Sequence, residues 1–294
     1  NSLNSDYKLY LKLLRPWQWA KNTLIIIPIV LSNSFGLDKF LDSIGIFFLF
    51  SFYVSGNYIL NDLNDIDLDR NHPEKKYRPI ASGEVSEKVA KRIAYFLLIS
   101  SLLITFINYE VEIVYLYLIY LFIAVVYTKS LKFVNFIDSI AISTLFLIRL
   151  TIGGIVVNLD ITIFLYIFTF FISMFIVYLK KNSILHKKLL DDNLFHKKLI
   201  DQNSKLNFKY ILIMLGIATN LSLILWSMNL TKDFSNYKWI ALIAYNVIFA
   251  YIIYRLINNS KKAELEDFVF GLFKDKVLIG LLVAILILFV YFYF

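Results

Sequence analysis

The feature that most constrains this chain is a series of long apolar segments that recurs from one end of the sequence to the other. The 294 residues are 59% hydrophobic, whereas a soluble domain is about 45–50% apolar. About twenty apolar residues cross a bilayer as a helix, and a β-barrel would show alternating segments of about ten residues instead. We therefore predict an all-α fold, a polytopic integral membrane helical bundle of about nine transmembrane helices that forms a single domain over residues 1–294. The apolar segments run roughly over residues 16–35, 43–61, 90–107, 111–128, 134–156, 161–179, 208–230, 238–257 and 276–294.

The positive charges indicate how these helices are oriented. With nine spans, nearly all of the 30 lysines and arginines fall on the side of the N-terminus. Because cytoplasmic loops are rich in Lys and Arg, we expect this side to face the cytoplasm of a bacterial inner membrane. The net charge of +8 lies in short loops, which favours anionic lipids or substrates rather than nucleic acid. The chain has no cysteine, which excludes disulfides and thiolate metal sites, and its first residues do not predict a cleavable signal peptide.

The most acidic stretch follows the second apolar segment. Four aspartates, Asp62, Asp65, Asp67 and Asp69, lie within eight residues directly after Asn61. Asn61, Asp65 and Asp69 are spaced four apart, so a helix would place them on one stripe. Ionisable residues at membrane depth are expected to be functional, and oxygen ligands without Cys or His suit Mg²⁺, which uses one or two carboxylates and substrate phosphates. The alternative is a solvated acidic helix end with lysine counter-ions.

A second polar pair lies in the fifth apolar segment. Asp138 is near its start, and Arg149 lies eleven residues, or three helical turns, further on the same face. An arginine this deep in an apolar helix should face the bundle interior or a wet cavity. One interpretation is a structural Asp–Arg pair that packs two helices. The functional interpretation is a phosphate clamp beside a second metal-binding carboxylate.

Further basic residues ring the predicted cytoplasmic face. Lys21 lies near two tryptophans, a pattern that an interfacial aromatic belt would also explain. Arg78 lies in residues 71–83, a loop that we expect to form an irregular, ordered cap over the helix ends. A ten-residue repeat over residues 186–203 predicts an amphipathic surface helix, whose histidines are more readily explained as solvated than as metal ligands. The predicted substrate-binding residues are Lys21, Asn61, Lys75, Arg78, Lys132, Arg149, Lys180 and Lys181.

These residue types predict a class of reaction. Two acidic patches on separate helices can hold one or two Mg²⁺ ions that neutralise a leaving pyrophosphate, while arginines and lysines bind the remaining phosphate oxygens. The sequence has no Ser/His/Asp set, P-loop or GxGxxG motif, so hydrolase and nucleotide-fold functions find no support. We predict a Mg²⁺-dependent membrane transferase. Its predicted metal ligands are Asn61, Asp62, Asp65, Asp69 and Asp138. Its predicted catalytic residues are the four aspartates of this set, Asp62, Asp65, Asp69 and Asp138.

The same residues resemble the UbiA superfamily of membrane transferases. Asn61-Asp62-x-x-Asp65-x-x-x-Asp69 is similar to the first aspartate motif of that superfamily. Arg78-Pro79-Ile80 followed by Ser82-Gly83 is similar to the element behind it. The nine predicted helices agree with the same superfamily. The resemblance implies a UbiA-like transmembrane domain and a Mg²⁺-dependent transfer that releases pyrophosphate.

A narrower resemblance is to the decaprenyl-phosphate phosphoribosyltransferase branch of this superfamily. Residues 15–22, 69–83, 132–154 and 264–276 follow the pattern of that branch. The resemblance implies transfer of 5-phosphoribose from phosphoribosyl pyrophosphate to a polyprenyl phosphate, in the synthesis of a cell-envelope precursor. The chain departs from the pattern in two places. Position 142 is Ile where classical UbiA prenyltransferases have a second aspartate, and residues 179–184 lack the acidic end that the branch tends to carry.

Three functions therefore remain open. A site that binds a donor with a 5-phosphate and a lipid-phosphate acceptor needs fewer carboxylates and more cations than one that binds a prenyl pyrophosphate and an aromatic ring. The residues of this chain fit that need, which favours phosphoribosyl transfer. The first alternative is a classical prenyltransferase that moves a prenyl group from its pyrophosphate to an aromatic or other acceptor. The second is a lipid-phosphate transporter, although transporters often contain repeats and the acidic cluster occurs once. The membrane and the two substrates are the expected partners, a homo-oligomer is allowed, and nucleic acid is not expected.

Overall fold

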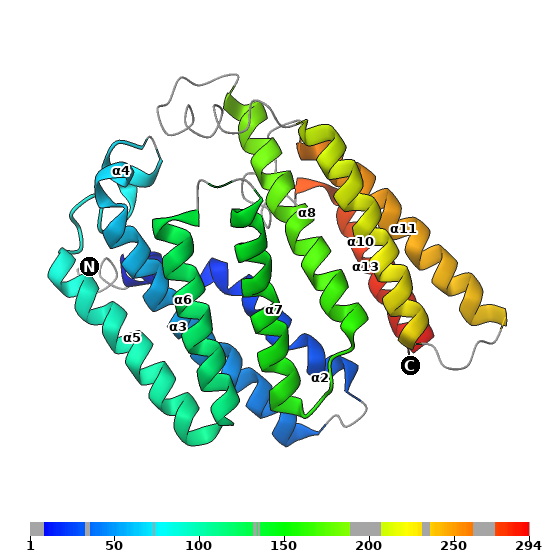
Figure 1. Cartoon of the computed structure of the whole chain (residues 1–294), viewed down its shortest axis with the longest axis horizontal. Coiled ribbons are helices and arrows are strands. Elements are labelled where there is room, and N and C mark those ends of the chain that lie inside the picture. The colour runs from blue at the N-terminus through cyan, green and yellow to red at the C-terminus, as the bar shows by residue number, and fades with distance from the viewer. Residues whose placement is uncertain are drawn as a thin grey trace. The chain divides into compact units, whose positions relative to one another are not determined.

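The computed structural model of the chain describes most of its residues, and every regular element among them is a helix, as the sequence predicts (Figure 1). Lys132 lies outside the described residues, and so does most of the repeat over residues 186–203. The described residues are 9–32, 36–72, 74–131, 134, 136–188, 207–230, 236–260 and 274–293.

Seven of these helices are long and apolar enough to cross a membrane. Large apolar side chains on them, such as Phe96, Phe122 and Met214, are 69–70% exposed. Such exposure would be unfavourable in water and is the expected state of a side chain that faces lipid. The seven helices are α3 (Leu37–Asn64), α5 (Glu87–Asn108), α6 (Val111–Lys129), α7 (Ile137–Val157), α8 (Ile163–Lys188), α10 (Phe208–Leu230) and α11 (Asn236–Ser260).

The predicted number of nine spans is not confirmed, because the first and last segments differ from the other seven. The first, predicted over residues 16–35, is divided into the 3₁₀ helix η1 (Pro16–Ile25) and the short helix α2 (Ile27–Leu31). Pro28 explains the division, since a proline ring clashes with the carbonyl four residues earlier in a continuous helix. The last, α13 (Lys276–Tyr293), contributes a shorter apolar stretch than the seven spans.

The long 3₁₀ helix η1 is anchored to α3 by side-chain hydrogen bonds. Runs of 3₁₀ helix beyond three or four residues are uncommon, because their hydrogen-bond geometry is poor. The indole of Trp19 donates to the hydroxyl of Ser55 at 2.9 Å, and the amide of Asn22 donates to Ser51 at 3.0 Å. Small serines on α3 therefore let η1 lie close and compensate for its weaker backbone bonding.

The described contacts divide the chain into two compact units. Unit 1 comprises residues 1–132 and 145–161, and unit 2 comprises residues 133–144 and 162–294. The boundary falls inside α7, so this one helix contributes to both units. The prediction of a single domain over residues 1–294 is not tested by this division and stays a prediction.

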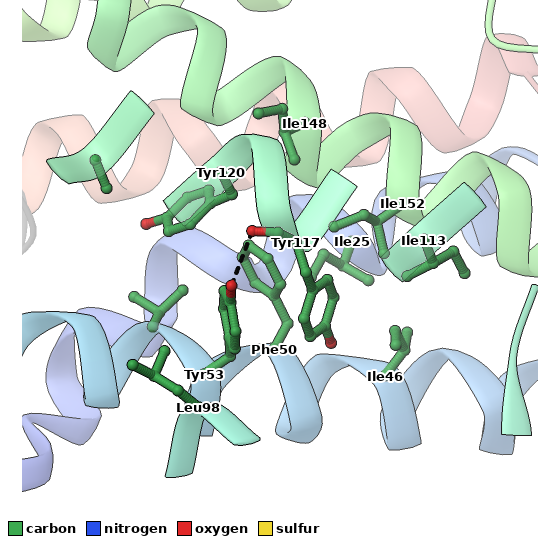
Figure 2. Close-up of a cluster of buried hydrophobic side chains, with 12 residues drawn as sticks. Ile25, Ile46, Phe50, Tyr53, Leu98, Ile113, Tyr117, Tyr120, Ile148 and Ile152 are labelled. Carbon is green, nitrogen blue, oxygen red and sulfur yellow. Dashed lines mark hydrogen bonds between the residues drawn. The ribbon is translucent and has the colours of Figure 1, made fainter. Parts of the chain in front are cut away.

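Unit 1 is packed around an aromatic cluster between α3 and α6 (Figure 2). Phe50 and Tyr53 of α3 meet Tyr117 and Tyr120 of α6, with ring centroids 4.7–5.1 Å apart. The Tyr53 hydroxyl donates to the Tyr117 carbonyl oxygen at 3.0 Å, so this buried phenol has a partner. On another face of α3, a β-carbon at Gly56 would stand 2.9 Å from a carbonyl oxygen of α5. The glycine thus permits α3 and α5 to pack closely.

Unit 2 is packed from α8, α10, α11 and α13. Phe175, Leu212 and Leu278 are almost fully buried in its core. The rings of Phe168 and Trp226 stack with centroids 5.9 Å apart, a contact that adds to the area the two rings bury. The core of unit 2 therefore joins helices that are far apart in the sequence.

The first turn of α13 is fixed by Asp275, which caps the helix and binds α11. One carboxylate oxygen accepts hydrogen bonds from the backbone N–H groups of Val277 and Leu278 at 3.1 and 3.2 Å. The Arg255 guanidinium donates to both carboxylate oxygens at 2.6 and 2.8 Å, and Asn259 donates to one at 2.9 Å. The Arg255 hydrogen bonds lower the pKa of Asp275 below its usual range. This cluster fixes α13 against α11.

Candidate active site

The acidic stretch lies at a bend where α3 ends and the short helix α4 (Ile66–Arg70) begins. Asp65 occupies the bend, yet the backbone bonds continue through it. The N–H of Asp65 donates to the Asn61 carbonyl at 3.0 Å, and the N–H of Asp69 donates to the Asp65 carbonyl at 2.8 Å. Helical backbone hydrogen bonds therefore still link Asn61, Asp65 and Asp69, as the predicted stripe requires. Asp62 and Asp69 are buried, whereas Asp67 is exposed.

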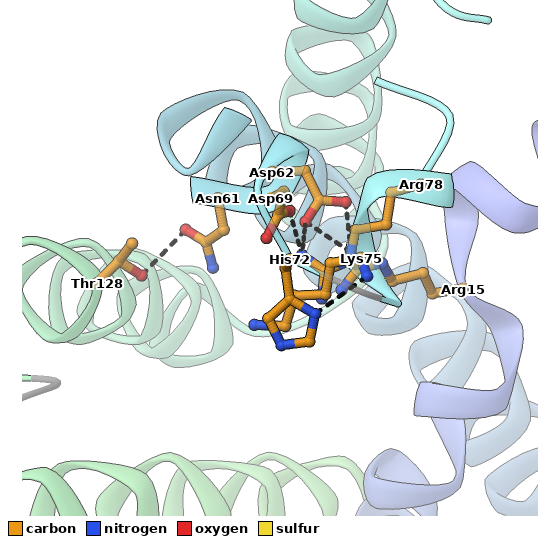
Figure 3. A network of polar contacts seen from close by, with 8 residues as sticks. All are labelled: Arg15, Asn61, Asp62, Asp69, His72, Lys75, Arg78 and Thr128. Carbon is orange, nitrogen blue, oxygen red and sulfur yellow. Dashed lines mark hydrogen bonds and ion pairs between the residues drawn. The ribbon is translucent and has the colours of Figure 1, made fainter. Parts of the chain in front are cut away.

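Two arginines hold the two buried aspartates (Figure 3). The Arg78 guanidinium donates to Asp62 at 3.0 Å and to Asp69 at 2.5 Å, and so bridges them. Arg15 contacts both carboxylate oxygens of Asp62, one of them at 2.6 Å. Two carboxylates and two guanidinium groups balance in formal charge, which is what allows the carboxylates to be buried. The alternative of a solvated acidic helix end with lysine counter-ions does not describe Asp62 and Asp69.

Arg15 belongs to this cluster although sequence reasoning did not place it among the site residues. It separates the helical residues 9–14 from η1 and adopts a left-handed conformation, with φ 53° and ψ 56°. That conformation costs a non-glycine residue roughly 1–2 kcal/mol. The pairing with Asp62, and a distance of 5.9 Å from its Cζ to the centre of the Tyr58 ring, offset this cost. Backbone strain held by buried contacts is a common property of functional sites.

The segment between α4 and α5 forms the irregular, ordered cap that the sequence predicts. The imidazole Nδ1 of His72 accepts hydrogen bonds from the backbone N–H groups of Glu74 and Lys75 at 3.2 and 3.3 Å. Burial, followed by the positive charge of Lys75, lowers the pKa of His72 below its usual value of 6.5. Gly83 has φ +83°, a left-handed turn that glycine adopts without strain. These turns hold Arg78 over the end of α3.

Asn61 connects the acidic stretch to α6. The Thr128 hydroxyl donates to the Asn61 side-chain oxygen at 3.1 Å, separately from the arginine–aspartate contacts (Figure 3). The same hydroxyl lies 2.9 Å from the Ala124 carbonyl oxygen, within the last turns of α6. The amide is therefore held in a fixed orientation beside the buried aspartates.

Arg149 lies deep in unit 1, enclosed by neutral groups. It is 3% exposed and donates to the Asn22 side-chain oxygen at 2.8 Å, the Leu145 carbonyl at 2.6 Å and the Tyr120 hydroxyl at 3.0 Å. Its Cζ lies 5.0–5.5 Å from the centres of three aromatic rings, including that of Phe50. These contacts make Arg149 a structural centre for η1, α6 and α7. A role in binding phosphate stays a prediction.

Gly153, one turn after Arg149, explains how η1 approaches α7. A β-carbon at this position would stand 2.2 Å from the Ile25 carbonyl oxygen. No larger residue fits without a backbone shift, so the glycine is required for packing. Gly153 therefore has a packing role in unit 1.

Asp138 forms a separate polar group in unit 2. Its carboxylate is paired with Lys181 of α8, with 2.5 Å between Nζ and Oδ2, and it also accepts two hydrogen bonds from Ser139. The structural pair of Asp138 with Arg149 considered from the sequence is thus replaced by a pair with Lys181. Lys180, on the same turn of α8, is exposed.

The remaining predicted residues are less closely gathered. The Lys21 ammonium donates to the Gln18 side chain at 2.7 Å on the exposed side of η1, and Lys75 is half-buried in the cap. Lys132 lies outside the described residues. The structure thus brings together Asp62, Asp69 and Arg78 in unit 1, and Asp138 with Lys181 in unit 2.

The donor set of the acidic stretch fits a hard cation that shares its ligands with a substrate. Among the described residues, no three His, Cys, Asp or Glu side chains are grouped so that they could hold a metal ion. Mg²⁺ commonly binds through one or two carboxylates, with phosphates and water completing its shell. Asp62, Asp65, Asp69 and the Asn61 amide carry oxygen atoms of the kind that Mg²⁺ binds. The residue types are therefore compatible with Mg²⁺ bound together with a phosphorylated substrate, and their role as metal ligands stays a prediction.

The comparisons with known proteins define the class of this chain. It matches the UbiA prenyltransferase family over residues 25–274 and belongs to that family. Members of the family are membrane transferases. Together with the seven long apolar helices, this membership makes the chain an integral membrane protein and gives the transporter alternative no support.

The curated relatives include two kinds of transferase. The chain is 29% identical over 180 residues to the decaprenyl-phosphate phosphoribosyltransferase of Mycobacterium tuberculosis, an alignment that covers 60% of this chain and 59% of that protein. It is 35% identical over 107 residues to the digeranylgeranylglyceryl phosphate synthase of Methanocaldococcus jannaschii, covering 34% and 35% of the two proteins. The chain thus spans about three fifths of the length of the mycobacterial relative. These likenesses confirm the resemblance drawn from the sequence.

Two solved structures show the same fold. One, concerning digeranylgeranylglyceryl phosphate synthase in membranes, has a TM-score of 0.66 at 20% identity and covers 98% of both chains. The other is a UbiA homologue from Archaeoglobus fulgidus bound to GPP and Mg²⁺, with a TM-score of 0.62 at 19% identity over 94% of this chain and 99% of that one. At these identities the structures establish the UbiA-like helical fold.

Proposed function

We propose that the chain transfers 5-phosphoribose from phosphoribosyl pyrophosphate to a polyprenyl phosphate and releases pyrophosphate. Its likeness to a decaprenyl-phosphate phosphoribosyltransferase over 60% of its length supports this choice. The observation that carries the proposal is the pairing of Arg15 and Arg78 with two buried carboxylates at the end of a membrane helix. Guanidinium groups bind phosphate in a bidentate manner, and a site with two of them suits a donor and an acceptor that both carry phosphate.

Mg²⁺ is proposed as the cofactor of this site. Asn61, Asp62, Asp65 and Asp69 would hold it, together with oxygen atoms of the donor pyrophosphate. When bound there, the ion would offset the charge that develops on the leaving pyrophosphate. Arg15 and Arg78 would then exchange part of their contacts with the carboxylates for contacts with phosphate oxygens.

The proposed reaction needs charge and positioning more than proton transfer. A phosphate oxygen of the lipid attacks the anomeric carbon of the ribose, and a new C–O bond forms there. The bond from that carbon to the pyrophosphate breaks, and its electron pair leaves with the pyrophosphate. The lipid phosphate is already ionised, so it needs little help from a general base. The residues of the chain would raise the rate by orienting the two substrates and stabilising the transition-state charge.

The other basic residues have proposed roles in binding the anionic groups of the two substrates. Lys75 is half-buried in the cap that holds Arg78, and Lys21 lies on η1. Each would supply a compact positive charge for a phosphate group. Lys132, Arg149, Lys180 and Lys181 complete the set proposed to bind the anionic groups.

A second candidate is prenyl transfer from a prenyl pyrophosphate. The 35% identity to a digeranylgeranylglyceryl phosphate synthase over 107 residues favours it, as does the shared fold of a UbiA homologue bound to GPP and Mg²⁺. A prenyl pyrophosphate would use the same acidic stretch and the same arginines. The two candidates therefore differ in which group is attached to the pyrophosphate.

The membrane orientation is also a proposal. The excess of Lys and Arg on the side of the acidic stretch supports an active site that faces the cytoplasm. A bacterial cytoplasmic membrane would supply polyprenyl phosphate from within the bilayer and the water-soluble donor from the cytoplasm.

The test uses purified protein in detergent with Mg²⁺ and two donor–acceptor pairs in parallel. Phosphoribosyl pyrophosphate is paired with polyprenyl phosphate, and geranylgeranyl pyrophosphate is paired with geranylgeranylglyceryl phosphate. We expect product with the first pair, none with Asp65→Asn, and undiminished product with the matched control Asp67→Asn, whose side chain is 91% exposed. Product formation by Asp65→Asn would refute the metal assignment. Product with the second pair and none with the first would establish prenyl transfer instead.

A further inference from the structure

Asn57 continues the polar stripe of the acidic stretch one turn deeper into α3. It precedes Asn61 by four residues within this helix, just as Asn61 precedes Asp65 at the helix end. Residues four apart lie on one face of a helix, and a rise of about 1.5 Å per residue places Asn57 roughly 6 Å before Asn61 along the axis. The stripe therefore extends from the end of α3 into the apolar part of the membrane helix.

The side-chain oxygen of Asn57 has no hydrogen-bond partner among the described residues. Asn57 is 2% exposed, and its Oδ1 is buried and unpaired. One turn earlier in α3, the Tyr53 hydroxyl donates to the Tyr117 carbonyl oxygen of α6 (Figure 2). One turn later, the Asn61 side-chain oxygen accepts from the Thr128 hydroxyl of α6 (Figure 3). Both neighbours on the stripe are thus bound to α6, whereas Oδ1 of Asn57 is not.

The position of this unpaired oxygen points to a ligand. A buried acceptor without a donor is unfavourable for folding, because it has lost water and gained nothing in return. The other unpaired side-chain oxygens in the described part of unit 1 are the hydroxyls of Thr105 on α5 and Tyr117 on α6. Asn57 differs from both because it lies on the stripe that is proposed to bind the donor. A ligand that brings a hydrogen-bond donor to this position would satisfy the amide.

The group attached to the pyrophosphate distinguishes the two candidate donors at this position. In phosphoribosyl pyrophosphate it is a ribose, whose hydroxyls at C2 and C3 can each donate to an amide oxygen. In a prenyl pyrophosphate it is a hydrocarbon chain, which would cover the amide oxygen and leave it unpaired at a cost in free energy. An asparagine one turn from the acidic stretch therefore suits a group that carries hydroxyls.

We propose that Asn57 binds a ribose hydroxyl of the donor and so contributes to the choice of phosphoribosyl over prenyl pyrophosphate. The hydroxyl donates to Oδ1 of Asn57, one turn before the residues proposed to bind Mg²⁺ and the pyrophosphate. This inference rests on the proposed function, because it assigns donor specificity to the same site.

The test measures whether Asn57 recognises a ring hydroxyl. Carbocyclic analogues of phosphoribosyl pyrophosphate, in which a methylene group replaces the ring oxygen, are used so that no transfer occurs. Isothermal titration calorimetry follows the binding of the full analogue and of its 2-deoxy and 3-deoxy forms to purified protein in detergent with Mg²⁺. One deoxy form is expected to bind the unmodified protein roughly two- to tenfold more weakly than the full analogue, the effect of one neutral hydrogen bond. Asn57→Leu should bind that deoxy form no more weakly than the full analogue, because the partner of the hydroxyl is gone.

The matched control is Thr105→Val, which removes an unpaired buried hydroxyl of the same unit away from the stripe and should keep the hydroxyl dependence. Asn57→Ala removes the amide without adding volume and decides the inference in the same way should Asn57→Leu fail to fold. Equal binding of all three analogues by the unmodified protein, or an unchanged hydroxyl dependence in the Asn57 variants, would overturn the inference and leave the proposed function intact. A full analogue that binds no more tightly than inorganic pyrophosphate would refute phosphoribosyl pyrophosphate as the donor, and the inference with it.

Discussion

Replacing Arg78 with methionine should destabilise the protein by about 3 kcal/mol, because its guanidinium bridges two buried carboxylates. Asp62 and Asp69 keep 7% and 4% of their side-chain surface exposed, and Arg78 keeps 27%. Breaking a buried ion pair by removing one partner costs about 3–5 kcal/mol, since the other charge stays buried. The lower end applies because Asp62 keeps its contact with Arg15. A change of about 3 kcal/mol is roughly 150-fold in the unfolding equilibrium constant.

The assay is reversible unfolding in mixed micelles of detergent and SDS, followed by circular dichroism. Arg70→Met is the matched control: Arg70 is 51% exposed and lies 3.7 Å from the exposed Asp67, and exposed pairs contribute about 0.2–1 kcal/mol. The double variant Arg78→Met/Asp69→Asn should recover part of the loss, because one unpaired buried charge is removed with the arginine. Equal losses in Arg78→Met and Arg70→Met would refute the argument that the Arg78 contacts are buried and coupled.

Other substitutions test separate parts of the account. Gly153→Ala should lower the unfolding temperature, because the new methyl group would stand 2.2 Å from the Ile25 carbonyl oxygen; an unchanged temperature would contradict this packing. Arg255 lowers the pKa of Asp275 from its usual 3.8, so the pair stabilises the protein above that pH and the contribution is lost as the pH falls through the lowered value. Asp275→Asn should therefore lose stability at pH 7 and show a smaller difference between pH 7 and pH 3 than the unmodified protein; parallel curves would refute this linkage. Asp65→Asn should abolish turnover and unfold at the same temperature as the unmodified protein, and a large loss of stability would indicate a structural role instead.

Most of the fold could be predicted because a bilayer selects for apolar length. The segments predicted over residues 90–107 and 208–230 agree within a few residues with Glu87–Asn108 and Phe208–Leu230. The first segment could not be resolved in the same way. Its apolar length matches a span, but Pro28 and the approach of η1 to Gly153 break it locally. The length of an apolar segment does not predict where its helix is interrupted.

The candidate site was predicted best where its residues are close in sequence. Asp62, Asp69 and Arg78 lie within seventeen residues, and the structure joins them. Arg15 reaches Asp62 across 47 positions, through a left-handed turn that residue types alone do not indicate. The only available signal was a cation directly before a proline at the start of an apolar segment.

The partner of Asp138 could not be predicted from spacing along one helix. Periodicity places Arg149 on the same face of α7, but the carboxylate pairs with Lys181 of α8. The lysine lies on another helix, and spacing along the sequence does not show which of that helix's residues face α7. Only the packing of unit 2 identifies the lysine as the partner. The sequence already shows that position 142, one turn after Asp138, is Ile and not a second carboxylate. The structure adds that the cation beside Asp138 is Lys181.

The central claim is tested most directly by following both parts of the donor. Purified protein is incubated with Mg²⁺, polyprenyl phosphate and phosphoribosyl pyrophosphate carrying one label in the ribose and another in the pyrophosphate. The account predicts that the ribose label enters the lipid extract, that the pyrophosphate label stays in water, and that EDTA prevents the transfer. Ribose label that never enters the lipid, in a preparation that consumes a prenyl pyrophosphate, would contradict the account.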